Sequence, residues 1–471
     1  MFFIKNNLYK STIRSRVKME KNDNGRLGKW ALTLGDFVLL HASFLLALKI
    51  QGSRVDDPFL IYFVSLAGIV TFYLFDLYSD CRRKRIKHLL YPLMIALFIF
   101  QIFLQVAGSF EKSFLFLQNH QLLLVAFVAQ CILIVAFRLA VWYIALLNTG
   151  KNNVLIIAKD EDESLHMANK FLNHTEGWFN VEGFLSADNT RQLEKHLSNI
   201  DSVVIGSGLP KAITDDIMSI CTEKGKEILI VPEMYELFIS VAKTQQIDDM
   251  LVFSIQPPKM SKSSLLAKRI FDITVALSIL ILTSPIFLLF SILIPATSRG
   301  PAFYKQERIG LRGERYNIYK FRSMKQDAEK LTGPTLAIDH DPRITKVGHL
   351  LRATRIDELP QIINVLKGEM SIVGPRPERE FFIHQFTRQV PNYLYRLTVK
   401  PGITGLAQVL GNYTTTVEDK LRYDLMYVRN YSLTMDIKIL LQTIGVVLQR
   451  DQAQGVKTEQ HKHQYRMLGT K

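Results

Sequence analysis

Two adjacent carboxylates in the carboxyl-terminal third of the chain are the residues best suited to chemistry. Asp357 and Glu358 precede Pro360, and the string QIINVLKG that follows, ending near Gly368, is typical of a helix with a proline in its first turn. The helix dipole stabilises carboxylates as anions at that end. An ionised aspartate can attack phosphorus or hold a Mg²⁺ ion that neutralises it. The alternative is that the pair only caps the helix.

Basic side chains in the same region could bind phosphate oxygens. Lysine offers such oxygens a point charge, and arginine offers a fork of donors. The candidates are Lys320, Arg322, Arg343, Arg352 and Arg376, the last of them in the string GPRP. Arginines near a membrane can instead contact lipid head groups, and GPRP could be only a rigid turn. We expect no nucleic-acid partner, because no recognised binding motif is present and the basic residues lie next to apolar segments.

The composition of the whole chain indicates a large, basic membrane protein. Its 471 residues leave room for about three domains at roughly 150 residues each. Lys and Arg give a net charge of +15, and 48% of the residues are hydrophobic, which argues against intrinsic disorder. The three cysteines lie far apart and never in a CxxC pair. This spacing excludes a disulfide framework and a cysteine-ligated zinc site.

Four apolar runs predict a bundle of transmembrane helices within 30–147. Each run has about the 20 apolar residues that a helix needs to cross a bilayer. The runs are 30–50, 59–78, 89–108 and 122–147. Lys and Arg are concentrated in the segment 1–29 and in the second loop, CRRKRIKH, so we expect both ends of the bundle on the cytoplasmic face of the cell membrane. The basic start of the chain also argues against a signal peptide.

Short β-branched runs alternate with polar helical stretches in 148–260. The runs NVLIIA, VEGFL, SVVIGSG and EILIVP have the spacing of parallel βαβ units and predict a Rossmann-like, doubly wound module. Its first turn reads AKDEDE where a phosphate-binding GxGxxG would lie, which places acidic side chains where an anion would approach. We therefore expect a scaffold, dimerisation or regulatory module rather than a dinucleotide site, and dimerisation would make the chain a homodimer.

A fifth apolar run, 270–296, has a different character from the first four. Ser284 and Pro285 lie in its middle, and a proline there removes a helical hydrogen bond and forces a kink. Both flanks are basic, so a straight span would export a basic C-terminal region against the usual charge rule. We expect a re-entrant helix that enters the bilayer, breaks at these two residues and returns to the same face. An ordinary kinked span is the alternative.

The strings between about 268 and 448 resemble one family, the bacterial sugar transferases, which are polyprenyl-phosphate hexose-1-phosphate transferases. The strings are KFRSM, DPRIT, DELPQ, NVLKGEMS, GPRP and KPGITG, in that order. The four spans and the Rossmann-like module precede these strings in the chain. The larger members of the family carry both of these parts and the small members lack them, so the chain resembles the larger members. One departure is AQVLG, where many relatives have a polar residue at the position of Leu410, so no sugar or nucleotide contact is carried over to that residue.

The resemblance implies a reaction and a role for each site residue. Members transfer a hexose 1-phosphate from a UDP-sugar, usually UDP-glucose or UDP-galactose, to undecaprenyl phosphate and release UMP, the first step of surface polysaccharide synthesis. Asp357 would be the nucleophile that forms a covalent phosphosugar intermediate. Glu358 would aid Mg²⁺ binding or proton handling. Lys320, Arg352 and Arg376 match basic positions of the family's phosphate site.

The resemblance also completes the expected architecture. Ser284 and Pro285 match the break in the family's re-entrant membrane helix. The fold class expected is a membrane protein of mixed α and α/β type, with a mainly helical monotopic catalytic domain that holds the re-entrant helix at the bilayer. The expected parts are a basic segment 1–29, the transmembrane bundle 30–147, the Rossmann-like module 148–260, the phosphoglycosyl transferase domain 261–450 and a polar tail 451–471. Within the catalytic domain, 433–448 is expected to lie along the membrane or to pack on the domain.

Two other functions are compatible with parts of the sequence. A nonenzymatic membrane sensor or scaffold would bind a nucleotide in the Rossmann-like module and would release no UMP. A processive glycosyltransferase would move the sugar without its phosphate and would release a nucleoside diphosphate instead. The released nucleotide therefore distinguishes the three functions.

Overall fold

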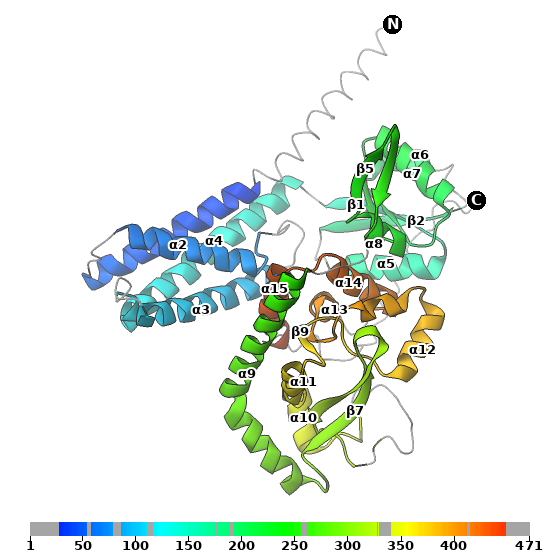
Figure 1. Cartoon of the computed structure of the whole chain (residues 1–471). Coiled ribbons are helices and arrows are strands. Elements are labelled where there is room, and N and C mark those ends of the chain that lie inside the picture. The colour runs from blue at the N-terminus through cyan, green and yellow to red at the C-terminus, as the bar shows by residue number, and fades with distance from the viewer. Residues whose placement is uncertain are drawn as a thin grey trace. The chain divides into compact units, whose positions relative to one another are not determined.

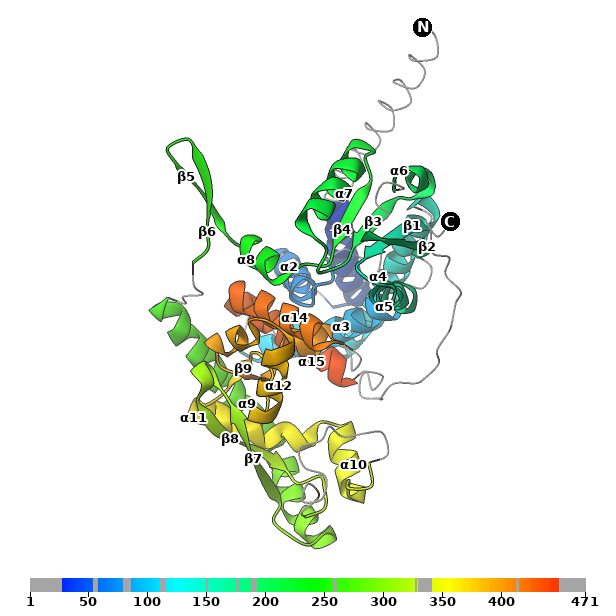
Figure 2. The same cartoon turned by 90° about the vertical axis from the view of Figure 1, so that its right-hand side faces the viewer.

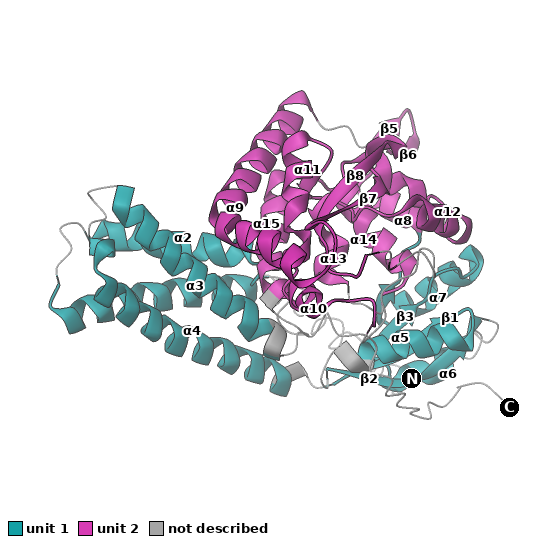
Figure 3. Cartoon of the chain, turned by 90° about the horizontal axis from the view of Figure 1, so that it is seen from below, with its two compact units in different colours: residues 1–233, 462–471 teal, residues 234–461 magenta. Residues whose placement is uncertain are grey.

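The structure is a computed structural model. It describes residues 28–53, 58–78, 86–110, 116–149, 151–174, 178–187, 193–256, 261–326, 328, 341–411 and 415–448. Residues 1–27 of the basic segment, residues 81–85 of the loop CRRKRIKH, and residues 449–471 with the whole predicted tail lie outside the described residues. The chain divides into two compact units, which are residues 1–233 with 462–471 and residues 234–461 (Figure 3). The predicted domain ranges within these units stay predictions.

Apolar helices form the first part of unit 1 (Figure 1). They are Gly28–Gln51, α2 (Phe59–Leu74), α3 (Ile86–Phe110) and α4 (His120–Thr149). Among the described residues, four helical stretches are long and apolar enough to cross a membrane: Gly28–Gln51, Leu89–Phe110, His120–Leu147 and, in unit 2, Lys262–Thr297. These helices fit a membrane protein by their length and composition, but the helix in the predicted second span, 59–78, is shorter than the prediction. This helix has only 16 residues, because the chain turns after Leu74 and Asp76 has a positive φ of 56°.

A buried ion pair lies inside this bundle. The guanidinium of Arg138 on α4 donates to the carboxylate of Asp36 on the first helix and, at 2.9 Å, to the carbonyl oxygen of Leu77. Gln101 on α3 donates to Gln130 on α4 at 2.8 Å. Polar contacts of this kind join helices whose remaining surfaces are apolar, and they fix how the helices are rotated against each other.

A four-stranded parallel sheet follows the bundle, with the strand order β2-β1-β3-β4 (Figure 2). Val154 and Ile156 on β1 point into a core that includes residues of α5, and Leu155 and Ile157 point into a second core with residues of α7. Helices therefore cover both faces, and the predicted parallel βαβ units are confirmed. The elements are β1 (Asn152–Ala158), α5 (Glu161–His174), β2 (Phe179–Ser186), α6 (Leu193–His196), β3 (Ser202–Ile205), α7 (Lys211–Glu223) and β4 (Glu227–Ile230).

The acidic turn after β1 is closed by one of its own carboxylates. Glu163 accepts hydrogen bonds at 3.2 Å from both the backbone N–H and the hydroxyl of Ser207, which follows β3. The carboxyl ends of β1 and β3 form the point where the strand order reverses, and ligands of open α/β sheets bind at such points. In this sheet the carboxylate of Glu163 accepts the hydrogen bonds that Ser207 could otherwise donate to a ligand.

Unit 2 is mainly helical, with three pairs of short strands (Figures 1 and 2). Its helices are α8 (Met234–Ile239), α9 (Lys262–Thr297), α10 (Lys346–Ala353), α11 (Ile362–Lys367), α12 (Glu380–Gln389), α13 (Leu406–Leu410), α14 (Val417–Arg429) and α15 (Leu433–Leu448). Its strands are β5 (Lys243–Ile247), β6 (Met250–Ser254), β7 (Phe303–Ile309), β8 (Arg315–Phe321), β9 (Ser371–Val373) and β10 (Gly402–Thr404). One buried core of this unit contains Val365 of α11, Ile372 of β9, Val428 of α14 and Ile439 of α15. α15 therefore packs on the unit, which is one of the two arrangements expected for 433–448.

The helix α9 passes through Ser284 and Pro285 without interruption. Pro285 has no N–H to donate to the carbonyl oxygen of Ile281, and the hydroxyl of Ser284 donates to that oxygen at 2.8 Å. The helix curves along its length (Figure 1) but does not end at these residues. The break of the membrane helix expected at Ser284 and Pro285 therefore stays a prediction, and the serine hydroxyl supplies a donor where the proline has none. The return to the same membrane face stays a prediction.

Candidate active site

The paired carboxylates lie in a 3₁₀ turn, Ile356–Gln361, that leads directly into α11. The turn begins after Arg355, which has a positive φ of 56°, and it contains Pro360. α11 ends at Gly368, whose φ of 88° is easily reached only without a Cβ atom. The predicted order of carboxylates, proline, short helix and glycine stop is confirmed. The two carboxylates thus come from a rigid turn with a helix behind it.

Glu358 is fixed by two cations from different parts of the chain. Its Oε1 accepts a hydrogen bond from Nζ of Lys320 on β8 at 3.0 Å and from Nη2 of Arg376 at 2.8 Å. Burial alone would raise the pKa of Glu358, but attraction to Arg376 and Lys320 and their hydrogen bonds lower it well below its usual value. Glu358 is therefore a permanent anion that orients two basic side chains.

Asp357 has the opposite electrostatic character. Its side chain is mostly buried, and within the described part of the chain no hydrogen bond or ion pair engages its carboxylate. Burial and then repulsion by Glu358 raise its pKa to about 6, against the attraction of Lys320, Arg352 and Arg376. A carboxylate that ionises just below neutral pH and has no fixed partner is well suited to act as a nucleophile.

The three other predicted phosphate ligands differ in how they relate to this pair. Arg352 on α10 is close enough to lower the pKa of Asp357, and its Nε donates to Oγ of Ser323 at 3.0 Å. Arg322 instead donates to the carbonyl oxygens of Ser298 and Arg299 at 2.7 Å each, which caps the end of α9. The structure therefore brings Lys320, Arg352 and Arg376 to the carboxylates, and Arg322 has a role in holding α9.

Arg343 makes a forked contact with Asp341. Its Nη2 lies 2.6 Å and its Nε 2.8 Å from the two carboxylate oxygens. The hydrogen bonds from Arg343 lower the pKa of Asp341 to about 2, so this pair is ionised at physiological pH. A contact of Arg343 with substrate phosphate stays a prediction.

The described residues hold no group of three or more His, Cys, Asp or Glu side chains that could bind a metal by themselves. Mg²⁺ is commonly bound by one or two carboxylates together with the phosphates of a substrate. The carboxylate of Asp357 fits that role, because it has no fixed partner among the described residues, whereas Glu358 already binds two cations. The Mg²⁺ expected from the resemblance therefore stays a prediction that the donor set accommodates.

The strings GPRP and KPGITG are brought into direct contact. β9 and β10 pair in parallel, and the N–H of Gly402 donates to the carbonyl oxygen of Pro375 at 2.9 Å. A Cβ atom on Gly402 would lie 2.1 Å from the backbone nitrogen of Gly374, so no other residue fits without moving the strands apart. This close approach holds the loop that carries Arg376.

A buried ion pair that the sequence analysis missed supports the same loop. Nη2 of Arg396 lies 2.8 Å from the carboxylate of Asp424 on α14 and donates to the carbonyl oxygen of Arg376, also at 2.8 Å. Burial raises the pKa of Asp424 to about 6, against the attraction of Arg396. Neither residue belongs to a recognisable string, and only their burial in the folded chain identifies them.

Comparison with known proteins shows which family the second half of the chain is similar to. Residues 263–450 match the family described as bacterial sugar transferase. The chain is 45% identical over 184 residues to the UDP-N-acetylgalactosamine-undecaprenyl-phosphate N-acetylgalactosaminephosphotransferase of Aeromonas hydrophila, covering 38% of this chain and 43% of that protein. It is 39% identical over 223 residues to the UDP-glucose:undecaprenyl-phosphate glucose-1-phosphate transferase of Escherichia coli (strain K12), covering 46% of this chain and 48% of that protein.

A relative from Caulobacter vibrioides, also named UDP-glucose:undecaprenyl-phosphate glucose-1-phosphate transferase, is 40% identical over 195 residues, which are 40% of this chain and 72% of that protein. The chain belongs to the bacterial sugar transferase family, and the resemblance in the sequence is confirmed. The matches span about half the length of the first relatives, and the family match falls within unit 2, where Asp357 and Glu358 lie.

Proposed function

We propose that the chain transfers a sugar 1-phosphate from a UDP-sugar to undecaprenyl phosphate and releases UMP, as the first step of surface polysaccharide synthesis. The names of the relatives support the two substrates. The observation that carries the proposal is that the two adjacent carboxylates have different environments. Glu358 binds Lys320 and Arg376, while Asp357 beside it has no fixed partner in the described residues and a pKa of about 6.

In the first step, a carboxylate oxygen of Asp357 attacks the phosphorus that carries the sugar. A bond from this oxygen to phosphorus forms, and the bond from phosphorus to the bridging oxygen of the diphosphate breaks, so UMP leaves with that electron pair. Arg352 and Arg376 lie close enough to Asp357 to lower its pKa, so their charges would also stabilise the phosphate oxygens in the transition state.

In the second step, an oxygen of undecaprenyl phosphate attacks the same phosphorus. The bond to Asp357 breaks, the carboxylate is regenerated, and the sugar 1-phosphate is now joined to the lipid phosphate. Both steps place anions against each other, which is why a site with several fixed cations is required. A Mg²⁺ ion bound through Asp357 and the substrate phosphates would neutralise part of that charge.

The proposed reaction takes place at the cytoplasmic face of the cell membrane. One substrate is water-soluble and the other keeps its tail in the bilayer, so they meet only at the interface. α9 supports this placement, because it exposes large apolar side chains along its length, among them Ile281, Leu282 and Leu288. A re-entrant course of α9 would hold unit 2 at that depth without carrying it across.

The released nucleotide provides the test of this function. Purified full-length chain in detergent is mixed with undecaprenyl phosphate, Mg²⁺ and a panel of UDP-sugars that includes UDP-glucose, UDP-galactose and UDP-N-acetylgalactosamine. We expect release of UMP with at least one sugar. Release of UDP would indicate a glycosyltransferase, and no nucleotide release with any sugar would contradict the proposal.

The covalent step requires a separate experiment. With a UDP-sugar labelled in the phosphate next to the sugar and no lipid acceptor, the wild-type chain should retain label after denaturation, and Asp357→Asn should retain none. Full turnover by Asp357→Asn would overturn the covalent mechanism. The homodimer stays a prediction, and light scattering of the purified chain measures it.

A further inference from the structure

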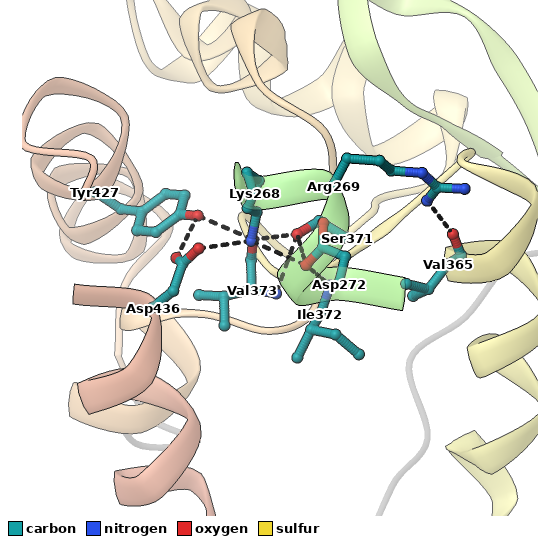
Figure 4. A network of polar contacts seen from close by, with 9 residues as sticks. All are labelled: Lys268, Arg269, Asp272, Val365, Ser371, Ile372, Val373, Tyr427 and Asp436. Atoms are coloured by element: carbon teal, nitrogen blue, oxygen red, sulfur yellow. Dashed lines mark hydrogen bonds and ion pairs between the residues drawn. The ribbon is translucent and has the colours of Figure 1, made fainter. Parts of the chain in front are cut away.

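A lysine on α9 is buried among charged and polar groups of its own helix and of two other elements, β9 and α15 (Figure 4). Lys268 is only 9% exposed, and its Nζ lies 2.7 Å from Oδ2 of Asp436 on α15 and 3.1 Å from Oδ1 of Asp272, one helical turn further along α9. The same Nζ donates to the carbonyl oxygen of Val373 on β9 at 3.3 Å. A buried ammonium group is stable only with such partners, so its position is tightly determined.

The carbonyl oxygen of Val373 is where this network converges. Besides Lys268, the hydroxyl of Tyr427 on α14 lies 2.9 Å from it, and the hydroxyl of Ser371 donates to it at 2.9 Å. Tyr427 also lies 2.8 Å from Oδ1 of Asp436, and its single proton can serve only one of these two acceptors at a time. α9 and α14 thereby meet at one peptide group of β9, and Asp436 on α15 contacts both of the side chains that reach it.

The chain has little freedom between this peptide group and the active site. Val373 is followed by Gly374 and Pro375, and then by Arg376, the partner of Glu358. The N–H of Gly374 donates to the carbonyl oxygen of Thr404 at 2.9 Å, and the ring of Pro375 fixes its own φ. A shift of Val373 is therefore passed on to Arg376 rather than absorbed by the loop.

We propose that Lys268 is a positioning residue for Arg376: by fixing the Val373 carbonyl oxygen between α9, α14 and α15, it sets where the Arg376 guanidinium stands beside Glu358. A displacement of α9 would then also displace Arg376 and its partner Glu358. This inference rests on the proposed function for its activity measurement, and a second measurement is independent of activity. A misplacement of about 1 Å can reduce a rate by roughly 100-fold, so the expected effect is large for a residue that never touches substrate.

A double-mutant cycle distinguishes positioning from a contribution to stability alone. Lys268→Met should lower kcat by roughly 10- to 100-fold with little change in KM for the UDP-sugar. If Lys268 acts through Arg376, the double variant Lys268→Met/Arg376→Ala should be no slower than Arg376→Ala alone. Effects that multiply in the double variant would overturn the inference. Arg422→Met is the matched control, because Arg422 forms its 2.7 Å ion pair with Asp419 within α14.

Amide hydrogen exchange supplies the measurement that does not depend on activity. In Lys268→Met the amides of Gly374 and Gly402 should exchange at least several-fold faster than in the wild type, and in Arg422→Met they should not. Unchanged exchange at both glycines would contradict the inference even if activity fell. If Lys268→Met does not fold, Tyr427→Phe removes only one hydroxyl from the same network and should show a smaller change of the same sign. If the wild type releases no UMP, the proposed function fails while the exchange measurement still decides on the positioning role.

Discussion

Replacing Glu358 by Gln tests the electrostatic basis of the proposed nucleophile. Asp357 has a pKa of about 6 instead of 3.8, which corresponds to about 3 kcal/mol of free energy opposing its ionised form. Burial is the larger cause, and repulsion by Glu358 is the second. Glu358→Gln removes the repulsion and leaves Lys320 and Arg376 without their anionic partner, so both changes favour ionisation of Asp357.

We expect the acid limb of the pH–rate profile to shift to lower pH. In the wild type, the rate of UMP release in a single turnover should fall below about pH 6, and one pH unit lower roughly a tenth of the Asp357 side chains are ionised. In Glu358→Gln the midpoint should move down by about one pH unit, which is about 1.4 kcal/mol, because burial of Asp357 remains. The maximal rate should fall, since Arg376 loses its hydrogen-bond acceptor.

The assay is single-turnover UMP release at saturating UDP-sugar, measured across the acid and neutral range. Glu380→Gln is the matched control, because Glu380 pairs with the exposed Arg315 and neither residue is among the groups that shift the pKa of Asp357. Its midpoint should equal that of the wild type. A midpoint in Glu358→Gln that stays at about pH 6 or rises would refute the assignment of Asp357 as the group that must ionise.

Three further changes test the surroundings of the site. The folded chain raises the pKa of Asp357 and of Asp424 from 3.8 to about 6. The free energy of unfolding in urea should therefore decrease as the pH rises from about 4 to about 6, because the folded state binds more protons than the unfolded state in that range. Asp424→Asn should make this decrease with pH smaller. Arg396→Met leaves Asp424 buried and unpaired and should cost about 3–5 kcal/mol in the same assay; a loss under 1 kcal/mol would show that the pair is not buried in solution. Gly402→Ala would place its Cβ 2.1 Å from the nitrogen of Gly374 and should lower UMP release at least 10-fold, and unchanged turnover would contradict the close approach of β9 and β10.

Features encoded by neighbouring residues could be predicted from the sequence. Asp357 and Glu358 are adjacent, and Pro360 and Gly368 delimit the helix behind them, so local rules were sufficient. The strands of unit 1 were also predictable, because runs of β-branched residues such as 154–157 identify buried parallel strands without knowledge of their partners.

Features that depend on distant residues could not be predicted in this way. Lys268 and Asp436 are 168 positions apart, and each looks like an ordinary polar residue of an amphipathic helix until α9 and α15 meet. The length of α2 was overestimated because apolar residues continue to Leu77 while Asp76 turns the backbone. The hydrogen bond of Ser284 could not be predicted either: the sequence shows that Pro285 removes a donor, but only the folded helix shows that the serine hydroxyl donates to the carbonyl oxygen of Ile281.

The contact between Glu163 and Ser207 has a consequence for the sheet of unit 1. A free phosphate that approached the ends of β1 and β3 would compete with a carboxylate that is attached to the same chain. The local concentration of a tethered ligand does not fall on dilution and is commonly in the millimolar range or above. A nucleotide phosphate would therefore have to displace the carboxylate of Glu163 before it could accept hydrogen bonds from Ser207.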